Sequence, residues 1–166
     1  MWMWLCLETL SDLSFLVSLG QFTLPISCLQ EPTAARLVRP VDKVFVECLK
    51  HEMLANPTTD VAPMIGLVHL PPGVAFDNLR PEAYTYETLG GNNSRTALAE
   101  LLEENADLKT DPRYSRRLVS VYCNLTDEEA QHLAVKHNRQ QSFVHQMTTQ
   151  DKVWICMLCI FILTPV

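Results

Sequence analysis

Residues 84–104, YTYETLGGNNSRTALAELLEE, decide the expected fold, because one short stretch passes from a strand pattern to a helix pattern. Residues 84–89 have a period of two, which predicts a half-buried strand: Tyr84, Tyr86 and Thr88 alternate with Thr85, Glu87 and Leu89. Gly90 and Gly91 follow at once. Residues 94–104 then have an apolar stripe of helical period, which predicts a helix: Ala97, Leu98, Leu101 and Leu102.

The double glycine places a polar loop between this strand and this helix. Glycine accepts a positive φ and allows the backbone to approach a ligand closely. The first N–H groups of the following helix have no intrahelical acceptor and lie at the positive end of its dipole, so they favour a phosphate or another oxyanion. The alternative is a turn that only changes the direction of the chain, which is the commoner role of such glycines.

The composition indicates one globular domain. The chain has 166 residues, of which 48% are hydrophobic and 19% charged. A net charge of -6 argues against a broad nucleic-acid surface, which usually needs a basic excess. Two local basic clusters are interpreted as solvated surface: Arg113, Arg116 and Arg117, and Lys136, His137 and Arg139.

The six cysteines are scattered and do not have the dense spacing of a secreted disulfide scaffold. Cys156 and Cys159 form a CxxC motif inside the apolar run VWICMLCIFIL, with no second ligand pair nearby. We interpret them as a buried, reduced pair and expect no metal site. This cysteine usage predicts an intracellular protein, in the cytoplasm or the nucleus.

The two ends differ from the middle of the chain. We divide the sequence into an apolar N-terminal extension, residues 1–35, a central domain, residues 36–152, and an apolar C-terminal tail, residues 153–166. Both ends are expected to be helical. No basic residue precedes Arg36, which argues against a signal peptide, and the apolar run after Lys152 is too short for a membrane span. A weaker alternative is a membrane-associated protein held by these ends.

The central domain alternates between strand and helix patterns. Expected strands are 41–48, 64–70, 84–89 and 117–123, and expected helices are 94–104, one opened by the capping box Thr126–Glu129, and one from Thr148 or Thr149. Residues 105–115 are expected to form a polar loop. This order predicts an α/β (α+β) domain in which a small mixed sheet is flanked by helices.

The ordered motifs resemble the ParB/sulfiredoxin-like superfamily, in particular the N-terminal domain of ParB chromosome-partitioning proteins. Residues 87–97, ETLGGNNSRTA, lie where that family has a strand, the sequence G-E-R-R-x-R-A and a helix. Residues 117–141, RLVSVYCNLTDEEAQHLAVKHNRQQ, are similar to its strand, its T-D-E-E-A helix and its E-N-x-x-R motif. The resemblance covers roughly residues 38–152.

The resemblance implies that both motifs meet in one pocket that holds nucleotide phosphates. By position, Gly91, Asn92, Asn93 and Ser94 take the places of G-E-R-R, Thr96 that of the later arginine, and His137, Asn138 and Gln141 those of E-N and the final arginine. Other residues therefore stand at four arginine positions of the family pattern, and Arg95, Arg139 or Lys136 would have to compensate. Sulfiredoxin chemistry is excluded, because Asn92 replaces its nucleophilic cysteine.

Two functional hypotheses follow. The first is a nucleotide- or phosphate-binding ParB-like domain, with Mg²⁺ accompanying a nucleotide and with weak phosphoryl transfer or NTP hydrolysis as the expected chemistry if the site turns over. Glu47, Glu52 and His137 are candidate acid/base groups, with surface roles as the alternative. The expected binding residues are Gly90, Gly91, Asn92, Asn93, Ser94, Arg95, His137, Asn138 and Arg139.

The second hypothesis is a degenerate, non-catalytic ParB-like domain that acts in protein interaction, as a homodimer or with a protein partner, or as part of a DNA-associated complex. In ParB proteins a helix-turn-helix follows this domain, and the present sequence stops about where that region would begin. We therefore do not expect sequence-specific DNA binding by this chain alone.

Overall fold

The computed structural model describes residues 18–57 and 62–139. It contains a mixed five-stranded sheet of order β1-β5-β3-β4-β2. The strands are β1 (Ser18–Pro25), β2 (Leu29–Gln30), β3 (Met64–Val68), β4 (Tyr86–Gly90) and β5 (Arg116–Cys123). β1 runs antiparallel to β5 and β3 antiparallel to β4, whereas β3 is parallel to β5 and β2 to β4. The predicted α/β class with a small mixed sheet is confirmed.

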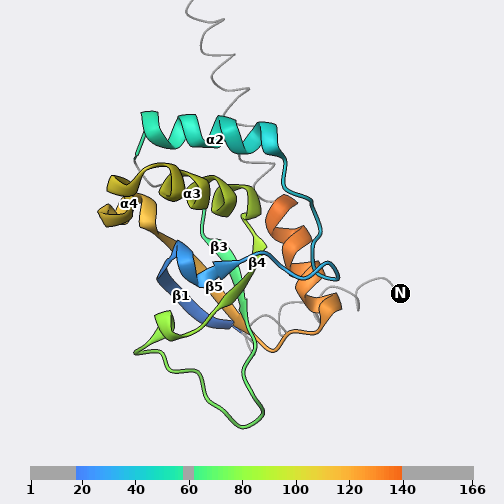
Figure 1. Cartoon of the computed structure of the whole chain (residues 1–166). Coiled ribbons are helices and arrows are strands. Elements are labelled where there is room, and N and C mark those ends of the chain that lie inside the picture. Colours follow the sequence, from blue (N-terminus) through green and yellow to red (C-terminus); the bar gives the residue numbers. More distant parts are fainter. Residues whose placement is uncertain (1–17, 58–61, 140–166) are drawn as a thin grey trace, which may run out of the picture.

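Helices cover both faces of the sheet (Figure 1). α3 (Asn92–Glu104) packs on one face, and α2 (Lys43–Ala55) lies outside α3. On the other face lies a helix over residues 127–139. Short helical segments complete the described chain: η1 (Ile26–Cys28), η2 (Pro81–Ala83), η3 (Ala106–Thr110) and α4 (Pro112–Ser115).

The side chains of β3 separate into two cores. Met64 and Val68 join the cluster beneath α3, while Ile65 and Leu67 join Ala130 and Ala134 of the helix over 127–139. This follows from the period of two along a strand. All five residues of β4 are buried, so the predicted half-buried strand at 84–89 is wrong in its burial, because the helix over 127–139 covers the second face.

The predicted strand at 41–48 is also wrong, because the residues from Lys43 onward form α2. The side chain of Asp42 caps this helix and accepts hydrogen bonds from the backbone N–H groups of Val44 (3.0 Å) and Phe45 (3.2 Å). Val46, Lys50 and Met53 are its buried residues, with the i, i+4, i+7 spacing of a helix face. Tertiary packing and the cap outweigh the β-branched composition.

Part of the expected N-terminal extension belongs to the sheet. Residues 18–25 were expected to be helical but form β1, which pairs with β5 from Leu24↔Arg117 to Gly20↔Val121. Residues 1–17 and the apolar tail from 153 onward, with Cys156 and Cys159, lie outside the described residues, as does the predicted helix from Thr148. The boundaries at 35 and 152 stay predictions.

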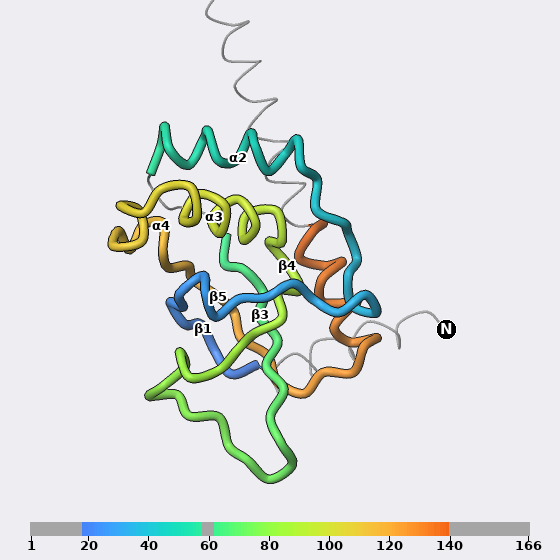
Figure 2. The backbone as a smooth tube through the Cα atoms, in the orientation of Figure 1, coloured from blue at the N-terminus to red at the C-terminus, as the bar shows by residue number. Residues whose placement is uncertain are grey.

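The segment from 69 to 85 leaves the sheet as a long excursion between β3 and β4 (Figure 2). An aromatic stack holds it to the sheet: the ring of Phe76 lies 4.8 Å from that of Tyr84 and 5.5 Å from that of Phe22 on β1. The predicted polar loop 105–115 follows α3 and contains η3 and α4. The predicted capping box is present, since Glu129 Oε2 accepts from the Thr126 N–H at 2.8 Å.

Candidate functional site

The glycine turn has the geometry expected of a helix start without a capping side chain. β4 ends at Gly90, and Gly91 is the N-cap of α3 with φ 90° and ψ 22°. This is the left-handed region, which glycine adopts without a steric penalty. A Cβ on Gly91 would also lie 2.9 Å from Cγ of Met64. The first-turn N–H groups of α3 therefore face the loop without a side-chain acceptor at the N-cap.

A second helix begins beside this turn. The backbone N–H of Asp42, the N-cap of α2, donates to Oδ1 of Asn93 at 3.0 Å. Lys50 of α2 bonds Glu100 and Glu104 of α3, so the two helices run in the same direction with their N-terminal ends together. Both positive dipole ends lie at one place, where an anion is favoured. The Asn93 oxygen, however, already has a structural partner.

Two polar atoms of the first turn of α3 are buried and have no hydrogen-bond partner among the described residues. These atoms are Oδ1 of Asn92 and Nε of Arg95. Arg95 Nη2 donates to the hydroxyl of its neighbour Thr96 at 3.3 Å. Burial lowers the pKa of Arg95, and the nearby carboxylate of Glu31 opposes this shift. Burial of unpaired polar atoms is costly, so this turn is where a ligand would be stabilising.

His137, on the helix over residues 127–139, packs against the glycine turn. Its imidazole is 8% exposed and packs on Gly90, where a Cβ would lie 2.4 Å from Nδ1. Nε2 lies 3.0 Å from the carbonyl oxygen of Pro63, so Nε2–H donates to it. Burial lowers the pKa of His137, and the bond to Pro63 opposes this. The imidazole is therefore neutral at pH 7 and shapes the wall of the loop without adding charge.

The structure brings most of the predicted binding residues together. The loop Gly90–Arg95 and His137 meet at the end of β4. Asn138 is half-buried and Arg139 is exposed. Of the candidate acid/base groups, Glu47 forms an ion pair with Lys50 (3.2 Å) and Glu52 is an exposed residue of α2. Their surface roles are therefore the better interpretation.

An ion network on the same strand was not predicted from the sequence. Glu87, 6% exposed on β4, accepts from Nη1 of Arg36 at 2.8 Å, and Nε of Arg36 bonds Asp127 at 2.6 Å. Nη1 of Arg36 also lies 2.7 Å from Nε2 of His69, which must then accept. The sequence did contain a signal of this network, because Glu87 is a charged residue in a strand whose other residues are buried. This network fastens the segment before α2 to β4 and to the helix over 127–139.

Two further findings concern the described residues only. No three histidine, cysteine, aspartate or glutamate side chains within 18–57 and 62–139 lie close enough to hold a metal ion. None of the helices in these ranges is long and apolar enough to cross a membrane.

No protein-family model matches the sequence, and no curated protein matches it. Among solved structures the fold is similar to the C-terminally truncated chromosome-partitioning protein ParB from Caulobacter crescentus, crystallised with CTP-gamma-S. The TM-score is 0.45 at 20% sequence identity, and the match covers 73% of this chain and 53% of that chain. The chain thus spans about half the length of the solved protein. The Caulobacter protein is a ParB, the group whose N-terminal domain the sequence motifs resemble.

Proposed function

We propose that the loop Gly90–Arg95 binds a phosphate group, either that of a nucleotide or a free phosphate. One observation carries the proposal: α3 starts on a left-handed Gly91 with no capping side chain, while the donor Nε of Arg95 is buried there without a partner. Backbone N–H groups at a helix start, with one arginine beside them, form a suitable receptor for an oxyanion.

The residues would have different roles. The N–H groups of Asn92, Asn93 and Ser94 would contact the phosphate oxygens, and Arg95 would supply the positive charge. Neutral His137 would fix the position of Gly90 by packing against it. Asn138 and Arg139, which end the described part of the helix over 127–139, would close the site.

Magnesium would be held mainly by the nucleotide. Mg²⁺ prefers several oxygen ligands, and the loop offers one buried amide oxygen, Oδ1 of Asn92. The Asp42 carboxylate is engaged as the cap of α2. These residues do not fit a protein-held Mg²⁺ site, so no catalytic step is assigned to the ion. Phosphoryl transfer or hydrolysis stays an expectation of the resemblance.

The alternative is a non-catalytic interaction domain, and one observation favours it. Asn93, at one of the family's arginine positions, uses its oxygen to hold α2 through the Asp42 N–H. A side chain that joins two helices is not free to hold a ligand. In that case the domain would act as a homodimer or with a protein partner, and its location in the cytoplasm or nucleus would follow from the cysteine usage alone.

A thermal-shift assay of the full chain tests the proposal. The full chain is required because β1, residues 18–25, is part of the sheet. The probes are CTP, ATP, GTP and inorganic phosphate, each with and without Mg²⁺; CTP is included because the Caulobacter protein was crystallised with an analogue of it. A ligand at 100 times its dissociation constant adds about 2.7 kcal/mol, enough for a shift of several degrees.

The variants are Asn92→Ala and Arg95→Met, with exposed Arg39→Lys as the control. The proposal expects a shift in wild type and in the control that both site variants lose. No shift with any probe would overturn it and leave the interaction domain, which sedimentation of the full chain would then examine.

A further inference from the structure

A second candidate site lies at the start of β5, apart from the glycine loop. A cavity of about 310 Å³ is lined there by three arginines together with Thr23, Ala62, Pro112 and Leu118. The arginines are Arg113, Arg116 and Arg117, the cluster predicted from the sequence to be solvated surface. That interpretation is wrong for Arg117, which is 8% exposed. Burial lowers the pKa of its guanidinium, as expected for a cation held away from water.

The three arginines differ in their partners. Arg113 pairs with Asp111 through two nitrogens, at 2.7 Å and 3.0 Å from Oδ2. Arg116 bonds Glu82 and the carbonyl oxygen of Thr23. Arg117 donates Nη1 to the carbonyl oxygens of Arg113 and Arg116, while its Nε is buried without a hydrogen-bond partner. Within the described ranges it has no carboxylate partner.

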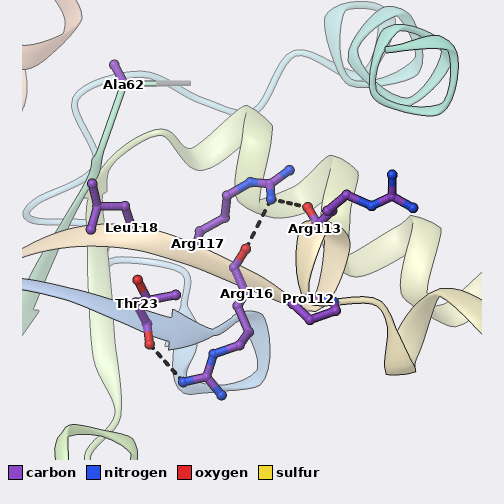
Figure 3. A pocket seen from close by; sticks show the side chains of 7 residues that line it. All are labelled: Thr23, Ala62, Pro112, Arg113, Arg116, Arg117 and Leu118. Atoms are coloured by element: carbon purple, nitrogen blue, oxygen red, sulfur yellow. Dashed lines mark hydrogen bonds between the residues drawn. The ribbon is translucent and has the colours of Figure 1, made fainter. Parts of the chain in front are cut away.

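Figure 3 shows how this difference arises. The guanidinium of Arg117 rises from β5 beside the Arg113 carbonyl, whereas the Arg116 side chain turns the other way, toward Thr23. Two of the three guanidinium groups, those of Arg113 and Arg116, have a carboxylate partner. The remaining positive charge is that of buried Arg117. A buried cation without a counter-ion is unfavourable, so the site is complementary to an anion.

We propose that this cavity binds a small molecule with one phosphate or carboxylate group, anchored by Arg117. The anionic group would meet the guanidinium of Arg117, and Pro112, Leu118 and the methyl group of Thr23 would contact a small apolar part of the ligand. The volume is at the lower end of the range of ligand pockets, which suits a compact molecule.

A nucleic-acid backbone is a poorer occupant. A duplex is held by exposed lysine and arginine side chains, and the net charge of the chain is -6. The one unpaired arginine here is buried, and exposed Arg113 already has a bidentate carboxylate. The site is also distinct from the glycine loop, because β3 lies between β5 and β4 in the sheet.

Calorimetric titration of the full chain with inorganic phosphate, acetate and phenyl phosphate tests the proposal. Arg117→Met keeps the length of the side chain and removes the charge, and Arg117→Lys keeps the charge and removes the planar fork. Arg95→Met removes the proposed loop site instead, and exposed Arg39→Lys is the matched control. We expect phenyl phosphate to bind wild type, Arg39→Lys and Arg95→Met. In the Arg95→Met background, either Arg117 substitution should weaken this binding at least tenfold.

Thermal melting shows that the variants are folded and gives an independent readout. In phosphate-free buffer Arg117→Met should keep a cooperative melt, although it loses the bonds to the Arg113 and Arg116 carbonyl oxygens. Added phenyl phosphate should stabilise Arg95→Met, which lacks the loop site, but not the double variant Arg95→Met/Arg117→Met. Equal affinity in Arg95→Met and in the double variant Arg95→Met/Arg117→Met would overturn the proposal. So would loss of binding in Arg95→Met alone, since the loop would then be the sole anion site.

A further variant distinguishes two possible partners of Arg117, a bound ligand and a carboxylate of the chain itself. Asp60 stands two residues before Ala62, a lining residue, and lies outside the described residues. If phenyl phosphate bound Asp60→Asn but not wild type, an internal carboxylate would be the partner of Arg117 and the proposal would be overturned. Equal binding by both supports it.

Discussion

The imidazole of His137 lies so close to Gly90 that a Cβ on this glycine would be 2.4 Å from Nδ1. The contact joins the last residue of β4 to the helix over residues 127–139, and Nε2 of the same ring holds the Pro63 carbonyl before β3. One side chain therefore sets the spacing of three elements at the glycine loop. Gly90 is required by this close approach, whereas Gly91 is required by its positive φ.

The first prediction concerns Gly90→Ala. The added methyl group would displace the His137 ring, and overpacking of this kind costs about 1–3 kcal/mol of unfolding free energy. Denaturant unfolding of Gly90→Ala, His137→Ala and the double variant measures the contact. We expect the double variant to lose less than the sum of the single losses, because removing the ring makes room for the methyl group. Strict additivity would show that the two residues do not meet.

The second prediction concerns pH. Burial keeps the pKa of His137 in the folded protein below the value of about 6.5 expected for the unfolded chain. Above pH of about 6.5, neutral His137 makes its full contribution to the free energy of unfolding. It is lost as the pH falls from about 6.5 toward the folded pKa, because the unfolded chain takes up the proton first.

Unfolding free energies measured from pH 8 to pH 5 should therefore decline in wild type, by at most about 1.4 kcal/mol per pH unit for this one group. His137→Gln should have a smaller decline over the same range. Exposed His132→Gln is the matched control and should follow wild type. A wild-type slope retained in His137→Gln would assign the effect to another group.

The third prediction concerns Lys50, which joins α2 to α3. Its Nζ lies 3.2 Å from Glu47, 3.4 Å from Glu100 and 2.5 Å from Glu104, and these carboxylates raise its pKa above the usual range. Lys50→Met should lower the melting temperature, because three carboxylates then repel one another. Adding Glu104→Gln to Lys50→Met should recover part of the loss. In wild type, the stabilisation by charged Lys50 is complete below pH of about 10.5 and is lost as the pH rises through the pKa of Lys50 in the folded protein.

The sequence predicted those parts of the fold whose signal is local. β4, the glycine turn and α3 each have their own period or their own glycine, and Thr126 and Glu129 form a capping box within four residues. β1 was missed because its stability comes from pairing with β5, far along the chain. The strand predicted at 41–48 was wrong because the cap at Asp42 and the packing on α3 outweigh the β-branched composition.

The site divides in the same way. The residues of the loop Gly90–Arg95 could be predicted from their spacing in the sequence. The contact of the His137 ring with Gly90 could not, because it depends on how the helix over 127–139 packs on the sheet. The burial of Arg117 depends likewise on α4 and β5 together, since the Arg113 and Arg116 carbonyl groups hold it. Such contacts have no signature in a single sequence.

The last prediction concerns the network around Glu87. This carboxylate is held in a buried strand by Nη1 of Arg36, and the Thr33 N–H donates to its other oxygen at 3.4 Å. Glu87→Gln keeps the shape and removes the charge that Arg36 requires, so it should cost about 1–3 kcal/mol of unfolding free energy. Asp127 is the other partner of Arg36, and the Asp127 side chain is 54% exposed. Asp127→Asn should therefore cost less than about 1 kcal/mol of unfolding free energy.

Hydrogen exchange would then locate the effect. The network fastens the segment before α2 to β4, so Glu87→Gln should increase exchange at residues 31–42 more than in the core strands β3 and β5. Asp127→Asn should leave that segment nearly as protected as in wild type, because the bond between Arg36 and Glu87 remains. Equal exchange at residues 31–42 in both variants would show that Asp127, not Glu87, holds Arg36 in place.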